Sequence, residues 1–138
     1  MHENRHPPQF LKSYSSLLEV LTDKQLASLG DAYINLVYSL ALSERKGRPD
    51  GTKVKGTVLA EALRKAGLRK LLPSRIDRHV LSDAAEALIV YAWLQNLFTL
   101  KESVEILAKP GNLEDRLAQL LLKAKDEIML SGLFPVPC

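Results

Sequence analysis

The most constraining feature of the sequence is residues 80–98, VLSDAAEALIVYAWLQNLF, because they are apolar on nearly every helical face from Leu81 onward. A helix at a protein surface keeps a polar half, whereas a helix that is apolar all round is surrounded by protein. The segment still carries Asp83 and Glu86, which are three residues apart and share one face. Burying two like charges without partners is costly. The pattern therefore predicts a buried central helix whose acids meet a cation from outside it.

A second helix, expected over residues 23–46, is also apolar almost all round but holds Asp31 in its middle. Gly30 precedes this acid, and glycine inside a helix costs about 1 kcal/mol relative to alanine. We therefore expect Gly30 to allow a close crossing of two helix backbones. Such a crossing would bring Asp31 towards the two acids of the central helix. Asn35, one turn later, would support the carboxylate or a water.

Three carboxylates on two crossing helices form an oxygen-rich site that suits Mg²⁺ or Mn²⁺. A metal at such a site can generate a hydroxide nucleophile and neutralise charge on a phosphoryl group. The spacing equally allows a purely structural arrangement in which arginines neutralise the acids. The candidate arginines are Arg64, Arg75 and Arg78.

Positive charge is concentrated in the middle of the chain. Residues 45–79 hold eleven Lys or Arg against three acids, although the whole chain has a net charge of only +3. A basic segment that leads into an acidic helix suits a polyanion held near a metal site. A solvated helix face and loop would show the same composition. The candidate contacts to a polyanion are Lys53, Lys55, Arg64, Arg69, Arg75, Arg78 and His79.

The apolar periodicity and the capping residues predict an all-α fold of about six helices. The expected helices span residues 9–21, 23–46, 52–66, 74–98, 99–108 and 113–130. Their predicted N-terminal caps are Thr22 or Asp23, Thr52, Ser74, Thr99 and Asn112. Gly67 is expected to end the third helix. Residues 1–8 are expected to form a flexible tail, and residues 9–138 a single domain.

The length of 138 residues is enough for one domain with its own core. The single cysteine, Cys138, excludes a disulfide framework and favours a reducing compartment. No apolar run reaches the roughly 18 residues of a spanning helix, and residues 1–10 lack the apolar core of a signal peptide. The sequence therefore predicts a soluble, cytoplasmic protein without a membrane partner.

The chain contains, in this order, the segments LASLGDAYINLVYSLAL, VKGTVLAEALRKAGLRKLL and VLSDAAEALIVYAWLQNLFTLKESVEIL. In their order and spacing they resemble the ribonuclease III family. LASLGDAYINLVYSLAL is similar to the family's signature helix, with its Leu-Gly-Asp-Ala core. VLSDAAEALIVYAWLQNLFTLKESVEIL is similar to the second acidic motif, Leu-x-Asp-x-x-Glu-Ala. Between them, VKGTVLAEALRKAGLRKLL resembles the family's middle section. The resemblance covers about residues 17–107.

This resemblance implies a ribonuclease III-like helical endonuclease domain that forms a homodimer and cleaves double-stranded or structured RNA. Glu86 would be the central metal ligand and Asp31 a second one, with Asp83 a ligand or an outer-sphere partner. The metal would be Mg²⁺, or Mn²⁺ in its place. Attack by a metal-bound water would leave 5′-phosphate and 3′-hydroxyl ends. The chain after residue 107 is too short for a double-stranded-RNA-binding domain, so RNA affinity would come from the basic surface of the endonuclease domain.

The chain departs from the family pattern around the first acid. Ala27 stands where the family has a Glu, and Ser28 replaces an aromatic residue that packs into the partner subunit. Upstream, a usual Glu-Arg pair is replaced by Lys24 and Gln25. The alternative function is therefore a catalytically silent, RNA-binding or scaffolding dimer. An all-α nucleotide pyrophosphohydrolase is disfavoured, because the only Glu-x-x-Glu pair lies on the unremarkable fifth helix.

Overall fold

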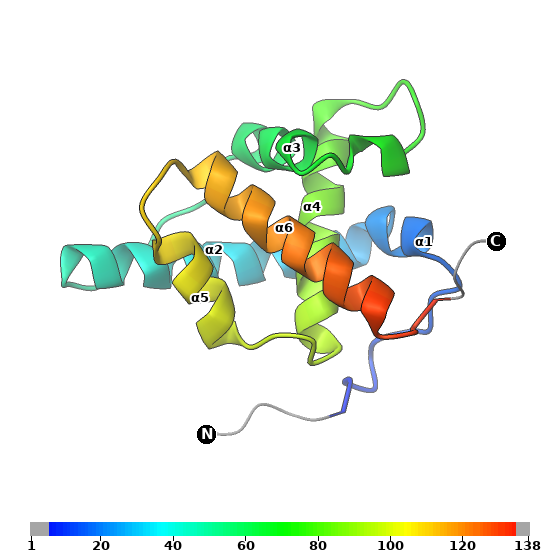
Figure 1. Ribbon diagram of the computed structural model, residues 1–138, viewed down its shortest axis with the longest axis horizontal. Coiled ribbons are helices and arrows are strands. Elements are labelled where there is room, and N and C mark those ends of the chain that lie inside the picture. Colours follow the sequence, from blue (N-terminus) through cyan, green and yellow to red (C-terminus); the bar gives the residue numbers. More distant parts are fainter. Residues whose placement is uncertain (1–5, 135–138) are drawn as a thin grey trace.

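A computed structural model describes residues 6–134, which form six α-helices and one short 3₁₀ turn and contain no strand (Figure 1). The helices are α1 (Leu17–Leu21), α2 (Lys24–Lys46), α3 (Gly56–Lys65), α4 (Arg78–Leu94), α5 (Leu100–Ala108) and α6 (Leu113–Leu130), with the 3₁₀ turn η1 at Arg69–Leu71. The predicted all-α fold is confirmed. None of the described helices combines the length and hydropathy that crossing a membrane requires.

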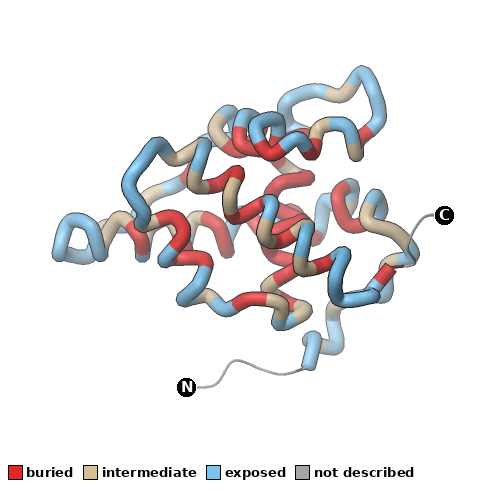
Figure 2. The backbone as a smooth tube through the Cα atoms, in the orientation of Figure 1, coloured by how far each residue is buried: buried red, intermediate tan, exposed pale blue. Residues whose placement is uncertain are grey.

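Helix α4 lies at the centre of the fold, as its composition predicts. It stands upright in Figure 1, where α2 passes behind it, α6 crosses in front and α3 lies above. Twelve of its seventeen residues are buried, and α1, α2, α3 and α6 all pack against it. The buried part of the chain is accordingly concentrated along this helix (Figure 2). An acid placed on α4 is therefore surrounded by protein.

Four of the predicted helix boundaries are confirmed by side-chain and backbone contacts. Asp23 caps α2 by accepting hydrogen bonds from the N–H groups at positions 25 and 26. Thr99 opens α5 in a capping box with Glu102, and Asn112 caps α6. Gly67 has a φ of +74° and follows the last turn of α3, where its N–H donates to the Arg64 carbonyl. Local chemistry is enough to place these ends.

The first helix is shorter than expected, since α1 comprises only Leu17–Leu21. Ser16 caps it by accepting from the N–H of Glu19, and the Ser15 side chain bonds the Glu19 carboxylate. These local bonds give the backbone an alternative to an earlier helical turn. Phe10, inside the range expected for this helix, is 70% exposed. Residues 1–5, which are most of the expected N-terminal tail, and residues 135–138, which include Cys138, lie outside the described residues.

Two other predicted caps are wrong because tertiary contacts and backbone conformation override them. Helix α3 begins at Gly56 rather than after Thr52, whose N–H and C=O groups are both bound by the Ser39 side chain of α2. Helix α4 is capped by Asp77 instead of Ser74. Arg75, between these two residues, has a φ of +60°, a left-handed conformation that a right-handed helix does not contain.

Candidate functional site

Helices α2 and α4 touch at their backbones where Gly30 meets Glu86. A Cβ atom built on Gly30 would lie 2.1 Å from the Glu86 carbonyl oxygen and 2.5 Å from its carbonyl carbon. Only a residue without a side chain fits there, so the predicted close crossing is confirmed. Asp31 is the next residue on α2, and the crossing therefore fixes its position against α4.

The carboxyl groups of Asp31 and Glu86 meet in a hydrogen bond beside this crossing. Glu86 is only 7% exposed, whereas Asp31 is exposed. Burial, the hydrogen bond with Asp31 and the negative charges of Asp31 and Asp83 raise the pKa of Glu86 to about 8. Near neutral pH the metal-free site therefore favours the protonated form of Glu86, which can donate a hydrogen bond to the Asp31 carboxylate.

No cationic side chain neutralises these three acids within residues 6–134. Arg64, one of the arginines considered for this purpose, lies 3.5 Å from Glu61 on its own helix. The negative charges of Asp31 and Asp83 therefore disfavour a charge on Glu86, and protonation of Glu86 relieves the repulsion. A bound cation would relieve it in the same way.

The donor set suits a hydrated divalent cation. Mg²⁺ is commonly held by one or two carboxylates with waters completing its shell, and Asp31 and Glu86 supply two neighbouring carboxyl groups. Among the described residues, no three His, Cys, Asp or Glu side chains form a ready-made metal cluster. Asp83 interacts with Glu86 through its charge. The assignment of Asp31, Asp83 and Glu86 as ligands stays a prediction.

Asn35 connects Asp31 to the segment between α2 and α3. Its Nδ2 donates to Asp31 Oδ1 at 3.3 Å, and its Oδ1 accepts from the Val54 N–H at 2.8 Å. Val54 is buried, whereas Lys53 and Lys55 on either side of it are exposed. The structure thus places Lys53 and Lys55 in a segment that Asn35 connects to Asp31 of α2.

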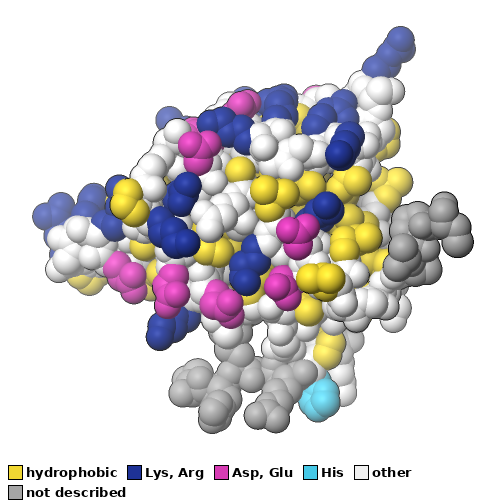
Figure 3. Space-filling model, in the orientation of Figure 1, with side chains coloured by type: hydrophobic (Ala, Val, Ile, Leu, Met, Phe, Trp, Pro, Cys, Tyr) yellow, Lys and Arg dark blue, Asp and Glu magenta, His cyan; other side chains and the backbone are white. Residues whose placement is uncertain are grey.

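The other predicted basic residues spread over α3, the turn after it and the start of α4. Arg69 donates to the carbonyl oxygens of Leu72 and Pro73 at 3.4 and 3.0 Å, so it holds the turn in place. Arg75, Arg78 and His79 are exposed. Figure 3 shows Lys and Arg side chains gathered over this edge of the molecule.

Two site residues that the sequence pattern did not single out are Ser39 and Ser43. Both bind backbone groups of residues 50–52 through their hydroxyls. Together with Asn35 they form a polar line at four-residue spacing on an otherwise apolar helix. That spacing was the signal available in the sequence.

The metal-free protein is expected to lose stability as pH rises from about 5 to 8. The folded-state pKa of Glu86, about 8, lies above its ordinary value of 4.5, so the folded protein binds an extra proton in this range. This contribution is full below the ordinary pKa and disappears as pH passes the folded one. Between these two pKa values, each pH unit lowers the free energy of unfolding by about 1.4 kcal/mol. Urea unfolding in EDTA at several pH values measures it, and Glu86→Gln should flatten the dependence.

Comparison with known protein families gives a match that covers most of the chain. The family model described as Ribonuclease III matches residues 24–130, which include both acidic helices and the basic segment between them. No curated protein matches the chain significantly. The matched region covers most of the sequence and carries Asp31 and Glu86 in the order and helical setting described above. The chain belongs to the ribonuclease III family.

Proposed function

We propose that the protein is a metal-dependent endoribonuclease that hydrolyses double-stranded or structured RNA and leaves 5′-phosphate and 3′-hydroxyl ends. The observation that carries this proposal is the contact between Asp31 and Glu86, which are held together at the Gly30 crossing without a cation. Helix α4 makes the contact rigid, because it is packed on several sides. A rigid pair of acids is what a phosphodiesterase metal site requires.

Each acid has a role in this proposal. Glu86, at the crossing, would be the central ligand, with Asp31 as the second one and Asp83 as a ligand or an outer-sphere partner. Mg²⁺ or Mn²⁺ would supply an activated water and neutralise charge on the phosphate. Asn35 would keep the Asp31 carboxylate in position through its hydrogen bond. The exposure of Asp31 leaves this side of the pair open to RNA.

RNA recognition would depend on charge and shape. Duplex RNA is recognised mostly through its phosphates and 2′-hydroxyls, and the exposed basic residues of α3, the following turn and the start of α4 suit such contacts. A homodimer would place two such surfaces on one duplex and raise the affinity by avidity. Exposed leucines on one stretch of α2 suit a second copy of the chain: Leu29, Leu36 and Leu40 are 39%, 49% and 37% exposed.

The direct test is cleavage of an end-labelled RNA duplex in Mg²⁺ or Mn²⁺, with EDTA and single-stranded RNA as controls. Metal-dependent cuts confined to the duplex, with 5′-phosphate ends, support the proposal. Duplex that is bound and left uncut favours the silent dimer instead. Ala27 is the observation behind this second candidate, because a buried methyl group stands where the family has a carboxylate.

Charge reversal of Arg64 and Arg75 is expected to weaken duplex binding. Both are exposed, and each phosphate contact that is lost should lower the slope of log affinity against log salt by about one. Binding measured between low and moderate salt gives this slope. Arg69 is left unchanged because it holds its own turn. Reversal of Lys101 and Lys109, on and after α5, is the matched control, and equal effects of the two pairs would place the RNA elsewhere.

A further inference from the structure

A ladder of side-chain hydrogen bonds fixes the segment that follows α2. Ser43 Oγ accepts from the Asp50 N–H at 2.8 Å, and Ser39 Oγ accepts from the Thr52 N–H at 2.9 Å. Asn35 Oδ1 accepts from the Val54 N–H at 2.8 Å. The Ser39 hydroxyl also donates to the Thr52 carbonyl oxygen at 3.0 Å. The single proton of the Ser43 hydroxyl lies within reach of two carbonyl oxygens, that of Ser39 at 2.8 Å and that of Asp50 at 3.2 Å. We call Asn35, Ser39 and Ser43 the side-chain ladder.

The spacing of the ladder matches the geometry of the two chains. Its members are four residues apart on α2, a rise of about 6 Å at 1.5 Å per residue. Their partners are two residues apart, a rise of about 6.6 Å in an extended chain. Residues 50–54 therefore run antiparallel to α2 in a defined register. Since the N–H groups at positions 50, 52 and 54 face α2, those of Gly51 and Lys53 face away from it.

The lysine end of this segment lies between the two acidic helices. On one side, Asn35 binds both Asp31 and the Val54 N–H. On the other side, a Cβ atom built on Gly56 would lie 3.6 Å from Ser82 Oγ, and Ser82 directly precedes Asp83 on α4. The segment is thus held in register along α2, where Asn35 connects it to Asp31. Just after the segment, Gly56 lies against Ser82 of α4, next to Asp83.

Lys53 and Lys55 are the free charges of this segment. Both are exposed, and neither forms an ion pair within the described part of the chain. In an extended chain, side chains two residues apart point to the same side, about 6.6 Å from one another. That separation is comparable with the distance between successive phosphates along an RNA strand.

We propose that residues 51–55 form a phosphate-binding segment that binds the RNA strand next to the phosphodiester bond that is cleaved. Lys53 and Lys55 would bind phosphates, together with the outward-facing N–H of Lys53. The side-chain ladder sets their position, and Asn35 is a positioning residue that couples the segment to Asp31. This inference rests on the proposed function, because it takes RNA as the ligand and the acid pair as the site of cleavage.

The test is a double-mutant cycle on duplex binding, measured in EDTA so that no RNA is cut. Lys53→Ala with Lys55→Ala should weaken binding about tenfold and lower the salt slope by about two. Ser39→Ala with Ser43→Ala keeps both lysines, yet should lose part of the same affinity. The four changes combined should cost less than the product of the two pairs, because the lysines contribute less once their register is lost.

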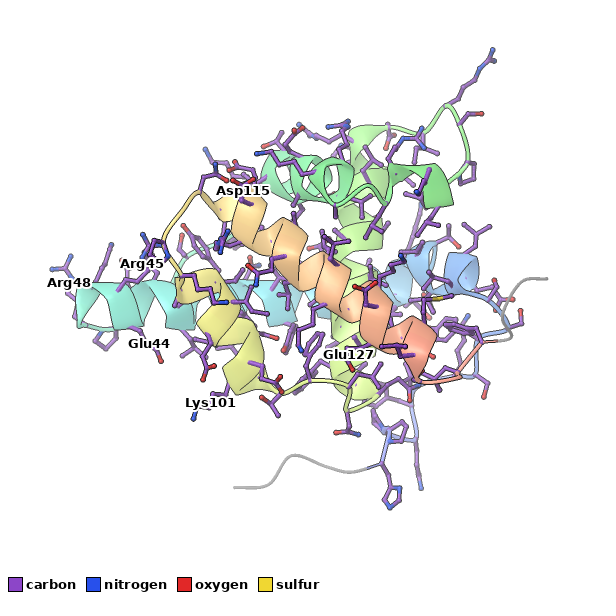
Figure 4. All side chains as sticks on the ribbon, viewed as in Figure 1. Glu44, Arg45, Arg48, Lys101, Asp115 and Glu127 are labelled. Atoms are coloured by element: carbon purple, nitrogen blue, oxygen red, sulfur yellow. The ribbon has the colours of Figure 1, made fainter. Side chains whose placement is uncertain are left out.

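The control pair is Lys101→Ala with Lys109→Ala, which removes the same charge. Figure 4 shows Lys101 at the start of α5, away from α3 and the upper part of α4. If wild type binds duplex but the Lys53 and Lys55 pair behaves like this control, the inference is overturned and the proposed function stands. If wild type binds no duplex, the proposed function itself fails. If the losses of affinity from the Lys53 and Lys55 pair and from the Ser39 and Ser43 pair simply multiply, the ladder's role is also overturned.

Steady-state cleavage separates Asn35 from the rest of the ladder. The serine pair should raise KM and leave kcat at saturating RNA unchanged, because it touches only the segment. Asn35→Ala should raise KM and also lower kcat, since Asp31 loses its hydrogen-bond donor. An unchanged kcat in Asn35→Ala would remove the coupling to Asp31. Should the serine pair fail to fold, Ser43→Ala alone tests the position farthest from the acids.

Discussion

Gly30→Ala is expected to destabilise the protein strongly, whereas Gly51→Ala is not. The added Cβ would lie 2.1 Å from a backbone carbonyl oxygen of α4, and no rotation of a side chain relieves that contact. Overpacking a core costs about 1–3 kcal/mol when neighbours can adjust. Here two helix axes must separate, so we expect a loss above about 3 kcal/mol, larger than the gain of about 1 kcal/mol in helix propensity.

Thermal unfolding followed by circular dichroism measures this loss, which should lower Tm by at least about 10 °C for a domain of this size. Gly51→Ala is the matched control, because a Cβ on Gly51 meets nothing within 4 Å. It should leave Tm within a few degrees of wild type. If Gly30→Ala did the same, the two helices would not need the backbone contact that places Asp31 beside Glu86.

Glu86→Gln is expected to abolish RNA cleavage while leaving the fold intact. Glutamine has the shape of the protonated acid, which is the form that the raised pKa of Glu86 favours below about pH 8 in the metal-free protein. It cannot give the negative charge that a metal ligand requires. A metal that stabilises the transition state by several kcal/mol is then lost, which corresponds to a rate at least about 10³-fold lower.

The measurements are single-turnover cleavage with Mg²⁺, Tm near pH 6, and duplex binding in EDTA. Only the rate of cleavage should change, and Tm and duplex binding should stay as in the wild type. Glu105→Gln, an exposed acid on α5, is the matched control and should cleave like wild type. Cleavage by Glu86→Gln at the wild-type rate would remove the acid pair from the mechanism. A large loss of Tm would mean that Glu86 serves stability instead.

The amino-acid sequence alone was enough to predict the central helix, four of the helix boundaries and the crossing at Gly30. These features depend on short-range patterns. An all-round apolar segment must be buried, capping residues act within one turn, and a glycine beside an acid inside a helix suggests a close neighbour. The same patterns placed Asp31 on one helix and Asp83 and Glu86 on another.

Only the tertiary structure decided the pKa of Glu86 and what surrounds this acid. The pKa of Glu86 depends on its burial and on Asp31 from another helix, and neither is visible in local spacing. One of the two wrong caps has the same origin: Thr52 is held by Ser39, thirteen residues away, so it cannot cap α3. Asn35 likewise reaches Val54 across nineteen residues. Sequence periodicity reports which face of a helix is buried, whereas hydrogen bonds between distant segments and the charge state of a buried group arise only when those segments meet.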